Sequence, residues 1–222
     1  MTIEAFSTTR SFMEFIGSSN EAISLCAQLA WVSFAEGNVG IGCVLLNSEG
    51  NVISEGRNQS LQDNPDATNF SRSAIAHAEM DALRKVRVPE IRGGTMVASL
   101  QPCDMCVGAS VLADISNVVF LAEDPYWAAA NAYDHFQYIV DQRYSVLCAL
   151  LPLITFSERW SLEQCSKFNT RYPKLFEIAL KYAKNDALRR FAVDQVNAEI
   201  GIDHLLSEVD MEECLGELRQ ST

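Results

Sequence analysis

Two short motifs in the first half of the chain contain the residue types that bind metals and transfer protons. One is His77-Ala78-Glu79, and the other is Pro102-Cys103-Asp104-Met105-Cys106. An H-x-E triplet often arises by chance, but both motifs together are expected only about once in a thousand chains of this composition. The pair is therefore a specific signal for a metal centre.

The donor set is typical of zinc. One imidazole (His77) and two thiolates (Cys103 and Cys106) form a borderline-soft set that suits tetrahedral Zn²⁺. Three protein ligands leave the fourth position open to water, as in catalytic rather than structural zinc sites. Zinc lowers the pKa of that water to about 7, and Glu79 is close enough in sequence to accept and return its proton. We predict one zinc ion per chain, with Glu79 as the catalytic proton shuttle.

Two other interpretations of the cysteine pair fit the sequence less well. A thioredoxin-like redox pair would leave His77 and Glu79 without a role, and the flanking Trp-Cys-Gly-Pro character is missing. A closed structural zinc site would need a fourth ligand. Cys43, Cys148 and His135 are available for it, but none has ligand-like spacing to the pair. Catalytic zinc is the favoured interpretation.

The elements that position the motifs follow from the hydrophobic pattern. A helix is expected from Ser18, which has capping-box spacing to Glu21, to a stop at Gly37. The other expected helices are 74–86, 103–113 and 126–141, and the expected strands are 39–46, 51–57, 95–100 and 117–121. The first two strands should form a hairpin, and the strand–helix–strand order that follows predicts parallel pairing.

The last third of the chain has a different character. Val146–Leu151 (VLCALL) is expected to be a buried strand or core segment, and it is too short to span a membrane. Residues 158–190 and 193–218 consist largely of helix formers. Lys174, Lys181, Lys184, Arg189 and Arg190 are expected to lie on one basic helix, most simply as a solvated face.

Composition narrows the class of protein. The chain has 222 residues, 48% of them hydrophobic and 21% charged, which is ordinary for a globular protein. Its net charge of −12 argues against a surface that coats nucleic acid phosphates. Residues 1–17 lack the features of a secretory signal, so the seven cysteines are expected to be reduced thiols in the cytoplasm.

The two motifs also resemble a known family. H-x-E followed by P-C-x-x-C is similar to the zinc-dependent cytidine deaminase-like superfamily, in particular to the branch of bacterial nucleoside and guanine deaminases and tRNA adenosine deaminases. The similar stretches are 76–83 (AHAEMDAL), 99–106 (SLQPCDMC) and 118–125 (VVFLAEDP), and the likeness extends from about Ser18 to about Asp141. The resemblance implies a three-layer α/β/α fold with a mixed five-stranded sheet. We expect a deaminase domain over residues 1–150 and a C-terminal helical extension over 151–222.

The resemblance also implies roles for individual residues. His77, Cys103 and Cys106 correspond to zinc ligands, and Glu79 to the proton shuttle. The substrate contacts that it implies are Asn58, the backbone around Ala76 and Ala78, and Asp124. Many members of the branch have D-P-T before the A-H-A-E segment, whereas this chain has Arg72-Ser73-Ala74-Ile75 before Ala76 and a longer polar loop.

The expected activity is hydrolytic deamination of a free nucleobase or nucleoside, with release of ammonia and without a nucleic acid or membrane partner. Homodimers are expected from the resemblance. The alternatives are a tRNA adenosine-to-inosine deaminase, which the basic residues between 174 and 190 would favour, and a non-catalytic zinc-binding interaction module. Glu79 speaks against the latter, because a structural site has no use for a carboxylate beside the open position.

Overall fold

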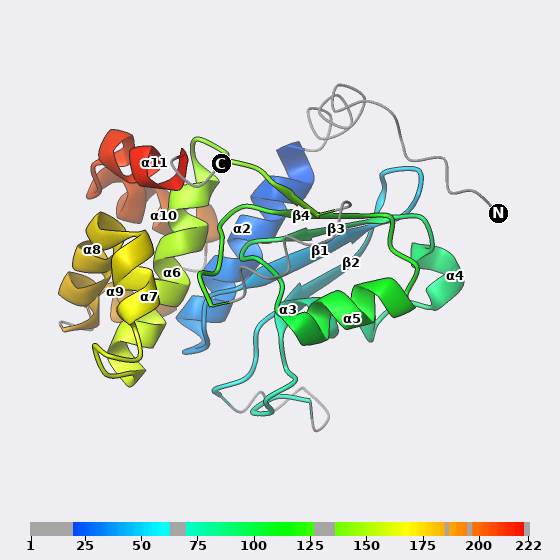
Figure 1. Cartoon of the computed structure of the whole chain (residues 1–222), viewed down its shortest axis with the longest axis horizontal. Helices are drawn as coiled ribbons and strands as arrows, with labels where there is room; N and C mark the ends of the chain where they lie inside the picture. The colour runs from blue at the N-terminus through cyan, green and yellow to red at the C-terminus, as the bar shows by residue number, and fades with distance from the viewer. Residues whose placement is uncertain (1–19, 63–69, 127–135, 185–186, 195–196, 220–222) are drawn as a thin grey trace.

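The computed structural model describes residues 20–62, 70–126, 136–184, 187–194 and 197–219. At its centre lies a five-stranded mixed sheet with the order β2-β1-β3-β4-β5. Helices cover both faces of the sheet, and a group of further helices lies at one of its ends (Figure 1). The sheet and its flanking helices agree with the expected three-layer α/β/α fold.

The strands form where the sequence is apolar and short. β1 (Gly42–Leu46) pairs antiparallel with both β2 (Val52–Arg57) and β3 (Thr95–Ala98). β3 then pairs parallel with β4 (Asn117–Phe120), which pairs parallel with β5 (Phe136–Tyr138). The hairpin of the first two strands and the parallel pairing of β3 with β4 confirm the sequence predictions.

The alternation of side chains along β1 divides the interior into two apolar clusters. Val44 and Leu46 belong to a large cluster with α2 (Asn20–Ala35) and the C-terminal helices. Cys43 and Leu45 belong to a smaller cluster that includes residues of α3 (Ala78–Leu83). Because successive side chains of a strand point to opposite faces, these clusters mark the two faces of the sheet. α5 (Asp104–Leu112) lies beside α3, and the short α4 (Val88–Ile91) lies at the far end (Figure 1).

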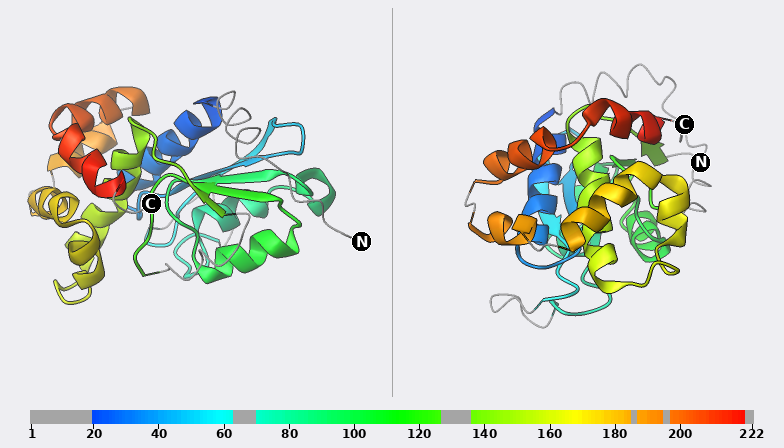
Figure 2. Two further views of the ribbon diagram at one scale, coloured as in Figure 1. Left: turned by 45° about the horizontal axis from the view of Figure 1, so that its top comes forward. Right: turned by 90° about the vertical axis from the view of Figure 1, so that its left-hand side faces the viewer.

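The C-terminal part of the chain is helical, as expected, and packs against the sheet layer. α6 (Tyr144–Arg159) contacts α2 and α8 and is buried over most of its length. The remaining helices are α7 (Ser166–Arg171), α8 (Pro173–Ala183), α9 (Ala187–Asp194), α10 (Ala198–Ser207) and α11 (Met211–Arg219). They gather around α6 and α2 (Figure 2). The division expected after residue 150 falls inside α6, and the large cluster holds residues from both sides of it.

Three details differ from the sequence predictions. Residues 136–138 form a strand rather than the end of a helix over 126–141, because they pair with β4; residues 127–135 lie outside the described ranges. Val146–Leu151 is a core segment, but it is helical rather than a strand, since it lies within α6. The basic residues 174–190 do not share one helix, because α8 ends at Ala183 and α9 begins at Ala187.

The ends of the first expected helix can be compared with the structure only in part. The first helix is described from Asn20, so its predicted cap at Ser18 lies outside the described residues, whereas its stop at Gly37 has the left-handed φ of 85° that favours glycine.

Within the described parts of the chain, no helix is long and apolar enough to cross a membrane.

Candidate active site

The three predicted metal ligands converge at the starts of two helices. His77 is the N-cap of α3, Cys103 is the N-cap of α5, and Cys106 lies in the first turn of α5. His77 Nδ1 lies 3.5 Å from Cys103 Sγ and 3.6 Å from Cys106 Sγ, and the two sulfurs are 3.7 Å apart. Tetrahedral zinc with Zn–S of about 2.3 Å and Zn–N of about 2.0–2.1 Å separates its ligand atoms by about 3.5–3.8 Å. The three side chains therefore already have the spacing that a zinc ion requires.

The electrostatics of this group favour a thiolate at Cys103, whereas hydrogen bonding with Cys103 and burial raise the pKa of the Cys106 thiol. Hydrogen bonding with Cys106 and His77 lowers the pKa of Cys103 to about 4, although burial opposes the shift. Hydrogen bonding with Cys103 raises the pKa of His77. The free N–H groups at the start of α5 add a partial positive charge that favours thiolates.

The fourth ligand of a closed structural site is not found among the described residues. The only metal-binding group of three or more side chains there consists of His77, Cys103 and Cys106. Cys43 lies in the smaller apolar cluster, and Cys148 is buried within α6 in the large cluster. His135 falls outside the described ranges. The described donor set thus has the three-ligand form of a catalytic site.

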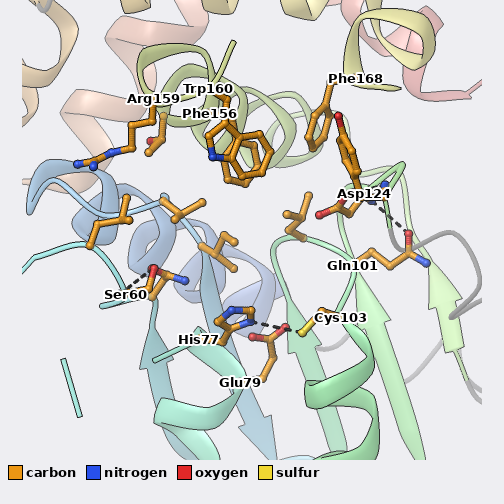
Figure 3. A pocket seen from close by; sticks show the side chains of 17 residues that line it. Ser60, His77, Glu79, Gln101, Cys103, Asp124, Phe156, Arg159, Trp160 and Phe168 are labelled. Carbon is orange, nitrogen blue, oxygen red and sulfur yellow. Dashed lines mark hydrogen bonds between the residues drawn. The ribbon is translucent and has the colours of Figure 1, made fainter. Parts of the chain in front are cut away.

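Glu79 lies beside the ligand group in the first turn of α3. Its side chain is only 3% exposed, and it lines the same cavity as His77 and Cys103 (Figure 3). Burial raises the pKa of the Glu79 carboxyl, and the nearby His77 charge opposes that shift. A carboxyl group with a raised pKa holds a proton more readily than an exposed one, which favours its use as a proton shuttle.

Helix α3 is held against β2 by unusually close backbone packing. A Cβ at Gly56 would lie 2.1 Å from Ala78 O, so only glycine allows this approach. The Ser54 hydroxyl donates a 2.8 Å hydrogen bond to Ala82 O. The buried Asp81 carboxylate accepts a hydrogen bond from the Arg57 backbone N–H at 3.2 Å. These contacts fix the position of the helix that carries His77 and Glu79.

The ligand group opens into a cavity of about 340 Å³. Its floor carries His77, Glu79 and Cys103, and the C-terminal helices lie across from it (Figure 3). Most of the other lining residues are apolar or aromatic, namely Val39, Ile41, Leu61, Leu100, Tyr126, Phe156, Trp160 and Phe168. Ligand pockets typically hold about 300–1,000 Å³ and combine an apolar lining with a few polar groups. The cavity therefore has the size and the lining of a small-molecule site.

The roof of the cavity comes from the C-terminal helices, of which the sequence analysis assigned no residue to the site. Phe156 on α6 and Trp160, the residue that directly follows this helix, stack with ring centroids 4.3 Å apart and an interplanar angle of 8°. Phe168 on α7 lies 5.5 Å from Phe156, and Tyr126 lies 5.2 Å from Phe168. The i, i+4 spacing of Phe156 and Trp160 was the only signal in the sequence, and it does not reveal which surface the pair covers.

Polar contacts fasten this roof to the loop after β4. Arg171 forms an ion pair of 2.5 Å with Glu123, and both side chains are partly buried. The Tyr126 hydroxyl donates a hydrogen bond to Gln164 O, and Lys167 Nζ lies 4.8 Å from the Tyr126 ring centroid. The roof and the loop that carries Asp124 therefore form one connected unit.

The structure brings two of the expected substrate contacts to the cavity. Asn58 and Asp124 both line it, and burial raises the pKa of Asp124 to about 6. Asn58 Oδ1 accepts hydrogen bonds from the N–H and hydroxyl of Ser60, which hold the side chain in place at the cavity wall. Ala76 and Ala78 are buried beside the site but do not line the cavity; the Ala76 carbonyl accepts a hydrogen bond from the Gln59 N–H.

The region that contains the ligand group is similar to a known family of zinc-binding domains. Residues 17–122 match the family model of the cytidine and deoxycytidylate deaminase zinc-binding region. This match to the family model confirms the resemblance carried by the two motifs.

Relatives with different names share this region. Over 109 residues the chain is 36% identical to a tRNA(Ile)-lysidine synthase from Deinococcus radiodurans, covering 47% of this chain and 17% of that protein. It is 34% identical over 90 residues to a cytosine deaminase from Candida albicans, covering 39% and 55%. It is 33% identical over 114 residues to a tRNA-specific adenosine deaminase from Haemophilus influenzae, covering 49% and 61%. The chain thus spans less than two thirds of each of these relatives.

Among solved structures, a guanine deaminase from Bacillus subtilis is similar with a TM-score of 0.39 and 26% identity. The match covers 52% of this chain and 70% of that one.

Proposed function

We propose that the protein is a zinc-dependent hydrolase that converts an aminated nucleobase or nucleoside to its oxo product and ammonia. The observation that carries this proposal is the joint placement of a three-ligand zinc group and a buried Glu79 on the floor of one aromatic-roofed cavity. The deaminase-type family match of residues 17–122 supports it. The relatives act on different substrates by name, so the base is chosen by the cavity rather than by the shared motifs.

In this mechanism His77, Cys103 and Cys106 would hold the zinc ion. Zinc bound there would supply an activated water for attack on the ring carbon that carries the amine. Glu79 would take one proton from the water and pass it to the ring nitrogen, and would then carry the second proton, from the new hydroxyl group, to the amine, which departs as ammonia. One water is consumed and one ammonia released, so the ring gains an oxygen in place of its nitrogen substituent.

The other cavity residues orient the substrate. Asn58 Nδ2 offers a hydrogen-bond donor, and Asp124 offers a carboxyl group that accepts hydrogen bonds from ring or amine N–H groups. Phe156 and Trp160 provide a flat aromatic surface on which a planar base can stack. Closure by this roof keeps bulk water from the reacting groups.

Glu79→Gln separates the catalytic role from metal binding. The variant should retain about one zinc per chain, because the three ligands are untouched, while turnover falls by about 10²–10⁴-fold or more. Zinc content and single-turnover ammonia release are measured on the same preparation, with Glu55→Gln on β2 as a control for loss of a carboxylate. If Glu79→Gln loses its zinc, Glu79 is a ligand. If it keeps both zinc and rate, the region is a non-catalytic zinc module.

A second candidate is adenosine deamination in tRNA, which the similarity to the Haemophilus influenzae protein favours. The charge balance speaks against it. Lys174 forms ion pairs with Glu177 and Glu213, and Arg189 pairs with Glu158, so these cations already have acidic partners. We expect no complex with total tRNA in a low-salt gel shift, and a tight complex that weakens steeply with salt would favour the tRNA activity.

We further propose that the protein acts in the cytoplasm as a homodimer. The cysteines support the cytoplasmic location, because every described cysteine is a free, buried thiol. The end of α5 supports the homodimer, because Val111 and Leu112 there are 50% and 84% exposed. Light scattering coupled to gel filtration tests the mass, and a monomer at all concentrations would exclude the dimer.

A further inference from the structure

Arg159, at the C-terminal end of α6, lines the rim of the cavity and has no hydrogen bond or ion pair with any described residue. Every other arginine in the described ranges makes at least one ion pair or other polar or ring contact. Its neighbour Glu158 pairs with Arg189 at 2.8 Å instead. In a protein of net charge −12, an arginine without an acidic partner at the mouth of a cavity is an available anion-binding group.

The charges of the cavity lining make this position distinctive. Among the described residues that line the cavity, Arg159 is the only lysine or arginine, and Glu79 and Asp124 are the only acids. Arg159 lies on the same side of the cavity as Phe156 and Trp160, across from Glu79 and His77 on the floor (Figure 3). A neutral base beside Glu79 has no need of a cation at the rim, so Arg159 fits a second group of the substrate at the end opposite to the amine.

We propose that the substrate carries an anionic phosphate monoester that Arg159 binds, which makes the substrate a nucleoside monophosphate. This inference rests on the proposed deaminase function and specifies its substrate class. A nucleoside monophosphate places the amine-bearing ring and the phosphate at opposite ends, which matches the placement of the ligand group and Arg159. The planar guanidinium binds phosphate oxygens through two parallel hydrogen bonds.

Arg159 also has a structural explanation, and it makes a different prediction. A cation in the last turn of a helix interacts favourably with the helix dipole. Loss of that interaction would lower thermal stability slightly and affect all substrates alike. Binding of a phosphate, in contrast, changes the preference between phosphorylated and unphosphorylated substrates.

The experiment compares nucleosides with their 5′-monophosphates, for each aminated base, in the wild type, Arg159→Gln and Arg92→Gln. Arg92 is the matched control, since it forms an exposed ion pair with Asp114 and does not line the cavity. The ratio of kcat/KM for monophosphate over nucleoside should exceed one in the wild type. It should fall by about 10–100-fold in Arg159→Gln, as expected for loss of charged hydrogen bonds, and stay unchanged in Arg92→Gln.

Three outcomes would overturn the proposal: no preference for the monophosphate in the wild type, an equal effect of Arg159→Gln on both substrates, or a preference for a short oligonucleotide that contains the same base. The last outcome would assign the rim to a nucleic acid phosphate. If no substrate releases ammonia, the proposed function fails. Calorimetric titration of the same monophosphates into the wild type and Arg159→Gln then still decides whether Arg159 binds phosphate.

Discussion

Gly56→Ala tests whether the close approach of α3 to β2 sets the geometry of the metal site. The new Cβ would lie 2.1 Å from Ala78 O and 2.5 Å from Ala82 N, both backbone atoms of α3 that have no flexible side chain to yield. An ordinary contact begins near 3.4 Å. The helix must therefore move away from the sheet by about 1 Å, as in other cases of overpacking.

The shift affects zinc as well as stability. His77 Nδ1 lies 3.5 and 3.6 Å from the two sulfurs, and α5 is not pushed by the new methyl group. Moving His77 alone by about 1 Å stretches the ligand triangle beyond the roughly 3.8 Å that tetrahedral zinc spans. We expect the free energy of unfolding to fall by about 1–3 kcal/mol from overpacking. A tenfold loss of zinc affinity would remove about 1.4 kcal/mol more when zinc is in excess.

Gly108→Ala is the matched control. Gly108 lies on α5, and a Cβ there would meet nothing within 4 Å. Alanine is favoured over glycine inside a helix by about 0.5–1 kcal/mol, so this variant should be slightly more stable and keep its zinc. The assays are urea unfolding with and without a chelator, and zinc content after dialysis. Equal stability and zinc content in the two variants would refute the argument that the glycine positions α3.

Two further predictions concern the metal and the C-terminal helices. Cys106→Ala should lose its zinc. A chelator should therefore lower the melting temperature of the wild type but not that of the variant. Full zinc occupancy in Cys106→Ala would exclude this residue as a ligand. Gly201→Ala places a Cβ 2.2 Å from the Trp31 ring, so α10 should separate from α2. The free energy of unfolding in urea should fall by about 1–3 kcal/mol. Gly216→Ala on α11, where a Cβ meets nothing within 4 Å, should not have this effect.

The sequence by itself identified the metal site. The H-x-E and P-C-x-x-C motifs predicted three side chains that converge and a carboxylate beside them, because each motif sits at the start of a helix, where local spacing controls direction. Short apolar runs, turn residues and helical patterns likewise predicted the hairpin and the parallel pairing of β3 with β4. Such features depend mainly on residues close together in the chain.

Features that depend on contacts between segments far apart in the sequence were decided by the tertiary structure. Residues 136–138 are a strand because β4 offers them an edge to pair with, and no local pattern records that edge. The apolar run Val146–Leu151 predicts burial but does not distinguish a strand from a helix. In the structure this segment is helical and packs with α2 in the large cluster. The roof of Phe156 and Trp160 and the rim arginine Arg159 meet a cavity whose floor is at His77, far away in sequence. Contacts between distant segments depend on how whole elements pack. The sequence therefore predicted the residues of the metal site, but it did not predict the shape of the cavity around them.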